Sequence, residues 1–185
     1  LSEEERSRII DLMEEWQIEA FLEGSEDVYC QRRDYRQKVM NIVRASFNKE
    51  GLGLSKFIED RNFVFDKFVF VADNPANSDA FIRSITSFID VIDRGKGMYE
   101  CVPKGFSKAS AMRLLSEHLN ISMDNTWAFG DSSNDLPMLR YVKNSVAMGN
   151  SDPASLKDEV AYVTDNASRD GIAKALKRFG FIGED

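Results

Sequence analysis

Residues 130–135, Gly-Asp-Ser-Ser-Asn-Asp, place two carboxylates, an amide and two hydroxyls directly after the apolar stretch Thr-Trp-Ala-Phe at 126–129. Magnesium takes oxygen ligands, and proteins hold it through one or two carboxylates together with water and substrate phosphate oxygens. The same residue types are also the preferred helix caps, and Pro137 suits the first turn of a following helix. The pattern therefore indicates either a cation site or a capped helix start, and both interpretations stay open at this point.

A calcium loop of the EF-hand type is a different possibility. Asp131, Ser133 and Asp135 fall at the first, third and fifth positions of such a loop. Its sixth position requires glycine and its twelfth glutamate, whereas this sequence has Leu136 and Val142 there. These residues cannot complete a calcium cage, so magnesium is the better match.

Lys108 is the second residue that could do chemistry. It follows Ser107, a natural helix cap, and therefore falls in the first turn of a predicted helix. A cation there opposes the helix macrodipole, which favours anions near the N-terminus by about 0.3–1 kcal/mol. A bound phosphate would compensate, because the helix terminus and the ammonium both attract anions. The alternative is a solvated surface lysine.

The elements that would position these residues follow position 103. From there helical and strand patterns alternate with short connections, which is typical of a parallel sheet with crossover helices. The stretches 126–129 and 145–148 are short and apolar, as strands covered on both faces should be. Residues 130–135 would then lie at the carboxyl end of a strand, where open α/β sheets bind ligands. We therefore predict that residues 103–185 form part of an α/β core.

Residues 1–102 have a different pattern, which predicts an α+β unit with mostly antiparallel strands. Ser2 and Glu5 form the sequence signature of a capping box, so the chain should open on a helix. Strand patterns facing each other across 94–97 predict a hairpin. The predicted strands are 18–24, 27–30, 65–73, 88–93 and 98–102, and further helices are predicted at 34–47 and about 78–88.

Composition excludes several classes of protein. The chain is 43% hydrophobic and 30% charged, which is ordinary for a globular protein, and its net charge of −7 argues against nucleic-acid binding. Cys30 and Cys101 are isolated and lack CxxC spacing, so we expect neither a zinc site nor a disulfide framework. No apolar run approaches the roughly 20 residues of a membrane helix, and no signal-peptide pattern is present. We therefore expect a cytoplasmic protein with no nucleic-acid or membrane partner.

Together these motifs resemble the haloacid dehalogenase superfamily of phosphohydrolases, and within it the Cof-like branch. The similar segments are 103–112 (PKGFSKASAM), 130–139 (GDSSNDLPML) and 146–176, which in order and spacing cover essentially all of residues 103–179. The resemblance implies a Rossmann-like parallel core at 103–185 and an α+β cap at 1–102 that confers substrate choice. It also implies magnesium-dependent hydrolysis of small phosphorylated metabolites. Sugar phosphates, pyridoxal phosphate and flavin mononucleotide are all suitable substrates for the family.

The resemblance also assigns roles to individual residues. It makes Lys108 the catalytic lysine that holds the charges of the nucleophile and the phosphate. It makes Asp131 a direct magnesium ligand, and it has Asp135 act on the metal mostly through water. Asn134 would lie beside the phosphate.

One part of the family pattern is missing from these 185 residues. Family members carry a strand ending in D-x-D, whose first Asp forms the phospho-aspartyl intermediate, and a Ser or Thr that binds phosphate. Asp90 and Asp93 are the nearest imitation of D-x-D and have the wrong spacing. Without that strand, its neighbour at 126–129 would have an open edge, which invites self-association or pairing with a partner chain. We therefore expect that roughly 80 upstream residues are lacking; the alternative is a non-catalytic module that binds a partner through this edge.

Overall fold

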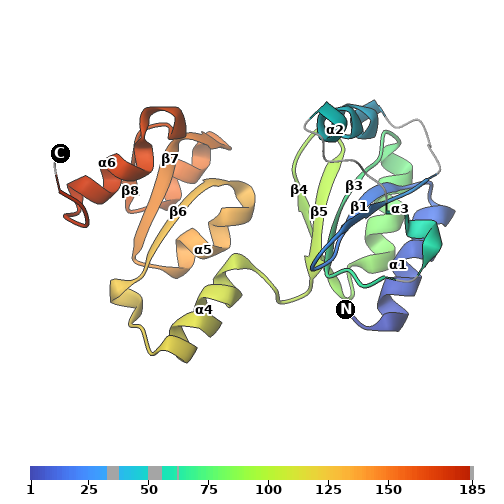
Figure 1. The fold of residues 1–185 in the computed structure, drawn as a ribbon, viewed down its shortest axis with the longest axis horizontal. Helices are drawn as coiled ribbons and strands as arrows, with labels where there is room; N and C mark the ends of the chain where they lie inside the picture. Colours follow the sequence, from blue (N-terminus) through green and yellow to red (C-terminus); the bar gives the residue numbers. More distant parts are fainter. Residues whose placement is uncertain (33–37, 50–55, 62, 184–185) are drawn as a thin grey trace. The chain divides into compact units, whose positions relative to one another are not determined.

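The computed structural model describes residues 1–32, 38–49, 56–61 and 63–183. The chain divides into two compact units, Leu1–Gly105 and Phe106–Asp185, whose elements are labelled in Figure 1. We describe each unit by itself. None of the helices in the described ranges is both long and apolar enough to cross a membrane.

The first unit is built on a five-stranded antiparallel sheet with the order β2-β1-β3-β5-β4. The predicted hairpin is confirmed, because β4 and β5 pair along their length from Ile89 with Pro103 to Asp93 with Tyr99. The antiparallel α+β prediction for this part of the chain is therefore confirmed as well. The strands are β1 Glu19–Glu23, β2 Val28–Cys30, β3 Lys67–Val71, β4 Ile89–Asp93 and β5 Met98–Pro103.

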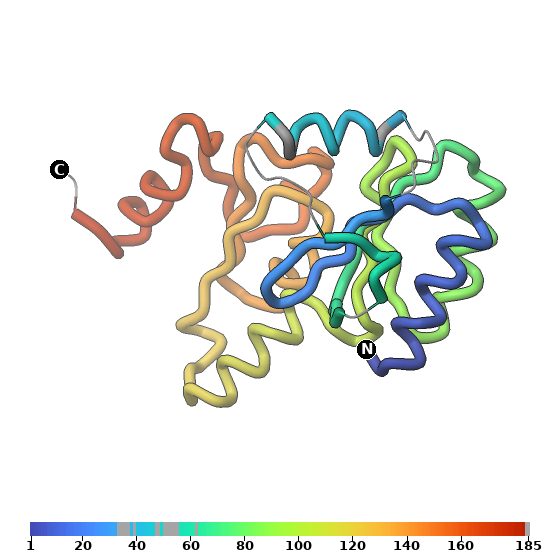
Figure 2. The backbone as a smooth tube through the Cα atoms, turned by 45° about the vertical axis from the view of Figure 1, so that its right-hand side comes forward, coloured from blue at the N-terminus to red at the C-terminus, as the bar shows by residue number. Residues whose placement is uncertain are grey.

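Helices α1 (Glu3–Glu15) and α3 (Pro75–Ile85) lie side by side, as the tube in Figure 2 shows, and pack on the same face of this sheet. The predicted capping box of α1 is present: the Ser2 hydroxyl accepts from Glu5 N, and the Glu5 carboxylate accepts from Ser2 N. Helix α3 begins earlier than predicted, because the Asn74 side chain caps it and Pro75 occupies its first turn.

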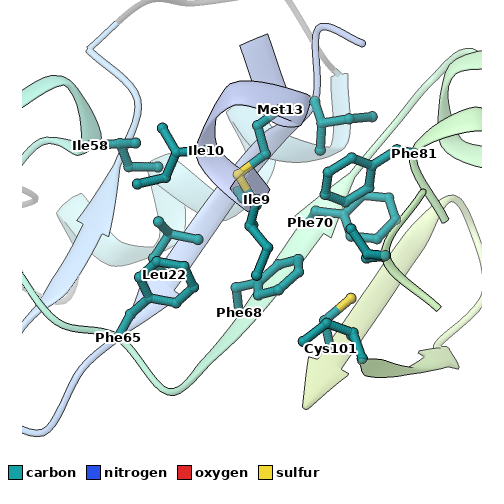
Figure 3. Close-up of a cluster of buried hydrophobic side chains, with 14 of the residues drawn as sticks. Ile9, Ile10, Met13, Leu22, Ile58, Phe65, Phe68, Phe70, Phe81 and Cys101 are labelled. Atoms are coloured by element: carbon teal, nitrogen blue, oxygen red, sulfur yellow. The ribbon is translucent and has the colours of Figure 1, made fainter. Parts of the chain in front are cut away.

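The core of the first unit combines aliphatic side chains with aromatic side chains from β3 and α3 (Figure 3). Phe68, Phe70 and Phe81 are fully buried, and the rings of Phe70 and Phe81 meet edge to face with centroids 5.0 Å apart. Such pairs stabilise beyond the area that they bury. On the opposite face, α2 (Lys38–Lys49) contributes Met40 to a smaller buried cluster. The part of the predicted second helix at 34–37 lies outside the described residues.

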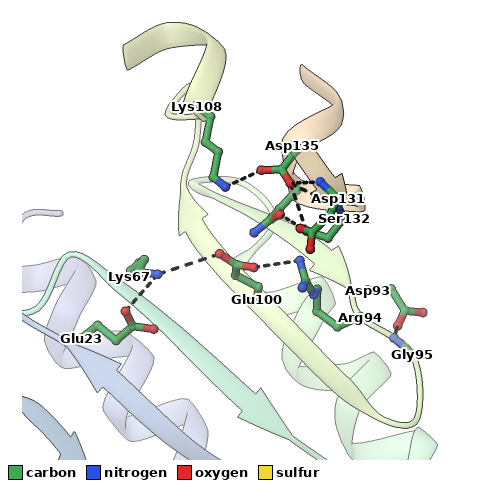
Figure 4. Close-up of polar contacts among 11 residues, drawn as sticks. Glu23, Lys67, Asp93, Arg94, Gly95, Glu100, Lys108, Asp131, Ser132 and Asp135 are labelled. Carbon is green, nitrogen blue, oxygen red and sulfur yellow. Dashed lines mark hydrogen bonds and ion pairs between the residues drawn. The ribbon is translucent and has the colours of Figure 1, made fainter. Parts of the chain in front are cut away.

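The carboxylates of β4 stabilise turns. Asp93 accepts from the backbone N–H of Gly95 at 2.7 Å, as drawn in Figure 4, and Asp90 accepts from Gly105 N at 3.1 Å. Their use in local turn structure agrees with the sequence-based view that they do not replace a D-x-D motif.

The second unit contains the predicted parallel sheet, with the order β6-β7-β8. Strand β6 (Trp127–Ser132) is followed by α5 (Leu136–Tyr141) before the chain enters β7 (Asn144–Asp152). The alternation of strands and helices predicted from 103 onward is thereby largely confirmed. Residues 154–159, which belong to the same predicted alternation, form a 3₁₀ helix. The remaining elements are α4 Lys108–Leu119, β8 Tyr162–Val163 and α6 Gly171–Arg178, with short 3₁₀ turns that include η3 Ser133–Asp135 and η5 Ala167–Arg169.

One side of this sheet is open, as expected from the sequence. Strand β6 pairs with β7 on one edge and has no strand partner on the other within the part of the chain that the structure describes. None of the residues of α4 is fully buried, and its Leu115 and Leu119 line an apolar groove of about 330 Å³ together with Ile121 and Trp127. Unpaired strand edges and exposed apolar surface of this kind mark a place where another segment can pack.

Candidate functional site

The candidate site, residues 130–135, comprises the carboxyl end of β6 and the η3 turn that leads into α5; we call this segment the loop. Gly130 brings the strand end and the loop into close contact, because a Cβ at this position would lie 2.6 Å from the Cβ of Asp135. No real Cβ tolerates such a distance, so the glycine is required for this fold of the loop. The sequence places its polar residues directly beyond this contact, at the sheet edge where ligands bind in open α/β folds.

Asp135 is the buried centre of the loop, with 6% of its side chain exposed. One carboxylate oxygen accepts hydrogen bonds from the backbone N–H groups of Asp131 at 2.9 Å and Ser132 at 3.1 Å. Asp135 therefore turns back toward the strand end and makes no side-chain cap to α5. With Ser132, however, Asp135 forms a capping box around the 3₁₀ turn η3, so the capping interpretation left open by the sequence is confirmed for this turn, and the cation interpretation stays a prediction.

Lys108 reaches the same carboxylate from α4 (Figure 4). Ser107 caps this helix by accepting from the backbone N–H of Ser110 at 3.1 Å, which confirms the predicted start and places Lys108 in the first turn. The Lys108 ammonium donates to the second oxygen of Asp135, and half of the lysine side chain stays exposed. The unfavourable cation at the helix N-terminus is thus balanced by a neighbouring carboxylate, while part of its charge still faces solvent.

The pKa of Asp135 reflects these contacts. Burial by itself raises the pKa of this carboxyl group, but the hydrogen bond from Lys108 and the two backbone N–H donors outweigh burial and hold its pKa below the usual value. Asp135 is therefore ionised at neutral pH. An ionised, buried carboxylate with three donors fixes the position of the ammonium of Lys108.

Asp131 and Asn134 lie on the accessible side of the loop. The Asp131 carboxylate is exposed, and one of its oxygens lies 3.4 Å from the side-chain nitrogen of Asn150 on β7. The Ser132 hydroxyl donates to the side-chain oxygen of Asn134 at 2.5 Å. The structure thus brings the four residues named from the sequence, Lys108, Asp131, Asn134 and Asp135, onto one loop and the adjoining helix start.

These residues fit one part of a magnesium site. Asp131 presents an exposed carboxylate, whereas both oxygens of Asp135 already accept hydrogen bonds, so Asp135 suits contact with a metal through water better than direct ligation. No group of three or more His, Cys, Asp or Glu side chains that could hold a metal occurs among the residues that the structure describes. Since magnesium retains several waters and takes substrate phosphate oxygens, one direct carboxylate is an acceptable protein contribution.

Sequence reasoning left two contributors outside the set of site residues. Ser132 orients Asn134, and Asn150 contacts Asp131 from the neighbouring strand. The position of Ser132 within 130–135 was a signal for its role. Asn150 matches a position near the cleft in the family that the sequence resembles, with a turn or cap residue as the alternative, and only the register of β7 against β6 brings it to Asp131.

The fold and this loop define a two-unit α/β protein, with a parallel sheet that presents an acidic loop and a separate antiparallel α+β unit. A family model described as haloacid dehalogenase-like hydrolase matches residues 1–176, and the chain belongs to this family. The resemblance and the fold class expected from the sequence are confirmed.

Individual relatives match parts of the chain. The 5-amino-6-(5-phospho-D-ribitylamino)uracil phosphatase YcsE of Bacillus subtilis is 39% identical over 75 residues, which are 40% of this chain and 30% of the relative. A phosphoglycolate phosphatase of Methanothermobacter thermautotrophicus is 35% identical over 91 residues, 49% of this chain and 40% of the relative. The matched stretch thus spans less than half the length of these curated relatives.

Solved structures agree with the fold over almost the whole chain. A sugar phosphatase of haloacid dehalogenase subclass IIB superposes with a TM-score of 0.78 at 22% identity, covering 98% of this chain and 68% of that protein. At this identity the similarity shows the fold alone. About a third of the sugar phosphatase has no counterpart in these 185 residues.

Proposed function

We propose that this chain forms the cap and the C-terminal half-core of a magnesium-dependent phosphatase of small phosphorylated metabolites. The observation that carries the proposal is the contact of Lys108 with the buried Asp135, beside the exposed Asp131 at the carboxyl end of β6. A fixed cation and an accessible carboxylate at this edge of a parallel sheet are what a metal-bound phosphate requires. The names of the relatives, which are phosphatases of small phosphorylated compounds, support the substrate class.

The chemistry assigned to each residue follows from its position. Phosphoryl transfer spreads negative charge over the equatorial oxygens, so catalysis depends on positioning and on electrostatic stabilisation. Lys108 supplies a positive charge whose position Asp135 fixes, and Asn134 supplies a polar contact beside the phosphate. Asp131 would hold magnesium, and the metal would neutralise phosphate charge when bound.

The nucleophile in this proposal comes from outside the 185 residues. They contain no D-x-D, and Asp90 and Asp93 accept hydrogen bonds in turns of the first unit. The open edge of β6 and the apolar groove beside α4 support an additional segment of roughly 80 residues, a length typical of half a domain of ordinary size. That segment would carry the aspartate that forms the phospho-aspartyl intermediate.

The rest of the proposal concerns location and partners. Cys30 and Cys101 are both buried and unpaired, which fits a reducing cytoplasm. The first unit would act as the cap that selects the substrate. We include no nucleic-acid partner, because the net charge is −7, and no membrane partner, because no apolar run in the sequence approaches the roughly 20 residues of a membrane helix.

A phosphatase assay tests this proposal. The 185-residue chain and a longer chain from the same gene, including an upstream D-x-D, would be given p-nitrophenyl phosphate with and without Mg²⁺. We expect phosphate release only from the longer chain and only with the metal. Release by the longer chain without any divalent metal would contradict the magnesium assignment, and equal release by both chains would contradict the missing nucleophile.

A binding module is the second candidate function, and the open β6 edge is the observation that favours it. In this alternative the edge pairs with a partner chain or with a second copy of this protein. Absence of phosphatase activity in both chains, together with oligomers or a captured strand at β6, would support this alternative over the enzyme.

A further inference from the structure

The register between β6 and β7 shifts at Asp131. Gly130 of β6 pairs with Ala147 of β7, but Ser132 pairs with Asp152. Only Asp131 therefore lies between the two pairings on β6, whereas residues 148–151 lie between them on β7. Bulges of this kind re-aim side chains and are common beside active sites. Here the extra length of β7 brings Asn150 next to the Asp131 carboxylate.

The orientation of the Asn150 amide is determined by its contacts. Its side-chain oxygen accepts from the backbone N–H of Ala167 at 2.8 Å. A backbone N–H can only donate, so the oxygen must face Ala167 and the NH₂ group must face the other way. The NH₂ group then points its donors at Asp131, 3.4 Å from the carboxylate oxygen.

The backbone around Asn150 is fixed on both sides. Gly149 donates its N–H to the carbonyl of Asp165 at 3.1 Å, and its own carbonyl accepts from the Lys157 ammonium at 2.6 Å. A Cβ on Gly149 would lie 2.9 Å from the backbone nitrogen of Asn166. The bulge and the loop before α6 can approach this closely only because position 149 is glycine.

We propose that Asn150 is a positioning residue, which holds the Asp131 carboxylate in one orientation by bridging it to the backbone of the η5 turn. This inference rests on the proposed metal role of Asp131. An exposed aspartate otherwise samples several rotamers, and the loss of this freedom on metal binding lowers the affinity for the metal. Outer partners of metal ligands commonly change metal affinity by about 10–100-fold when they are removed.

Manganese binding to the longer chain, which would carry the rest of the sheet, tests this inference without any need for turnover. Mn²⁺ prefers the same oxygen ligands as Mg²⁺ and is visible by electron paramagnetic resonance. It also broadens the backbone amide NMR signals of nearby residues such as Ser132. The titration would compare the natural chain with Asp131→Asn, Asn150→Ala, Ala167→Pro and Ser168→Ala, and melting temperatures would be recorded for each.

The Ala167→Pro variant removes only the N–H that anchors the Asn150 amide. Position 167 begins the η5 turn, where proline is tolerated, and the preceding Asn166 has φ −62° and ψ 152°, a conformation that a following proline favours. Ser168→Ala is the matched control, because Ser168 is exposed in the same turn.

We expect Asn150→Ala to weaken Mn²⁺ binding about tenfold with an unchanged melting temperature. Ala167→Pro should cause a smaller loss, and Ser168→Ala should bind as the natural chain does. If Asn150→Ala lowers the melting temperature, its weaker binding could come from lost stability. The affinity of Ala167→Pro for Mn²⁺ then decides whether the inference holds. If the variant that decides binds Mn²⁺ as tightly as the natural chain does, this inference is overturned, whereas the metal role of Asp131 stays intact. Equal binding by the natural chain and Asp131→Asn overturns the metal role itself, and the inference with it.

Discussion

Replacing Lys108 with methionine should lower phosphate release about 10²–10³-fold in the longer chain that we propose, which would carry the nucleophile. Methionine keeps an unbranched apolar stem but removes the charge that Asp135 holds in place. The phosphoryl group would then develop its negative charge without this cation. We expect the loss mainly in kcat, because an interaction that strengthens in the transition state affects turnover more than substrate binding.

Lys143→Met is a suitable control for this prediction. Lys143 also forms an ion pair, with Asp124, but 78% of its side chain is exposed and it lies at the start of β7, at the opposite end of the strand from the site. This variant should retain natural turnover. Turnover within twofold of natural in Lys108→Met would exclude a catalytic role for the lysine and leave it as a structural partner of Asp135.

Replacing Asp135 with asparagine should lower the free energy of unfolding of the second unit by about 2–3 kcal/mol. Breaking a buried ion pair usually lowers the free energy of unfolding by about 3–5 kcal/mol. We expect a smaller loss here because Lys108 is half exposed. The variant also weakens the acceptor for the N–H groups of Asp131 and Ser132. Urea denaturation followed by the fluorescence of Trp127 measures the effect, with Trp16 of the first unit replaced by phenylalanine in both proteins.

This difference should depend on pH. The pKa of Asp135 is lowered in the folded chain, so its contribution to stability is present above its unfolded pKa of about 4 and is lost as the pH falls through the folded value. The natural chain should therefore lose its advantage over Asp135→Asn below about pH 4. Asp165→Asn, which breaks the ion pair with Lys174 at a carboxylate less buried than that of Asp135, is the control and should change stability far less. An advantage that persists unchanged at pH 2 would contradict the assignment to Asp135.

Local signals were sufficient to predict much of the fold. The capping boxes at Ser2 and Ser107 fixed the starts of two helices, because the necessary hydrogen-bond partners lie three residues away in sequence. The hairpin of β4 and β5 followed from the turn residues between them. Parallel strands followed from short apolar runs alternating with helices. Each of these features is decided by residues close together in the chain.

The remaining features depend on contacts between distant residues. The carboxylate of Asp135 lies against the strand end and accepts from Asp131 N, and the strand can approach it this closely because position 130 is glycine. The pairing of Lys108 with Asp135 joins residues 27 positions apart. Asn150 approaches Asp131 because β7 contains extra residues at the bulge, and nothing local in the sequence marks that register.

The candidate site and the open sheet edge lie on the same strand, β6. Strand β6 carries the candidate phosphate and metal residues at its carboxyl end, and the same strand lacks a neighbour on one side within the described residues. A segment that added a strand there would place its own carboxyl end beside Asp131 and Lys108, if it ran parallel to β6. A strand that completed the sheet in this way would therefore also complete the site.

The most direct test of this account is a magnesium titration of phosphate release by the longer chain, natural and with Asp131→Asn. We predict that the natural protein requires Mg²⁺ and that Asp131→Asn lowers turnover at saturating metal by at least about 100-fold, with more Mg²⁺ needed for half-maximal activity. Asparagine keeps the size of the side chain and the backbone contacts of the loop. Equal turnover and equal magnesium dependence in the two proteins would contradict the claim that the loop at 130–135 is the metal half of a phosphatase site.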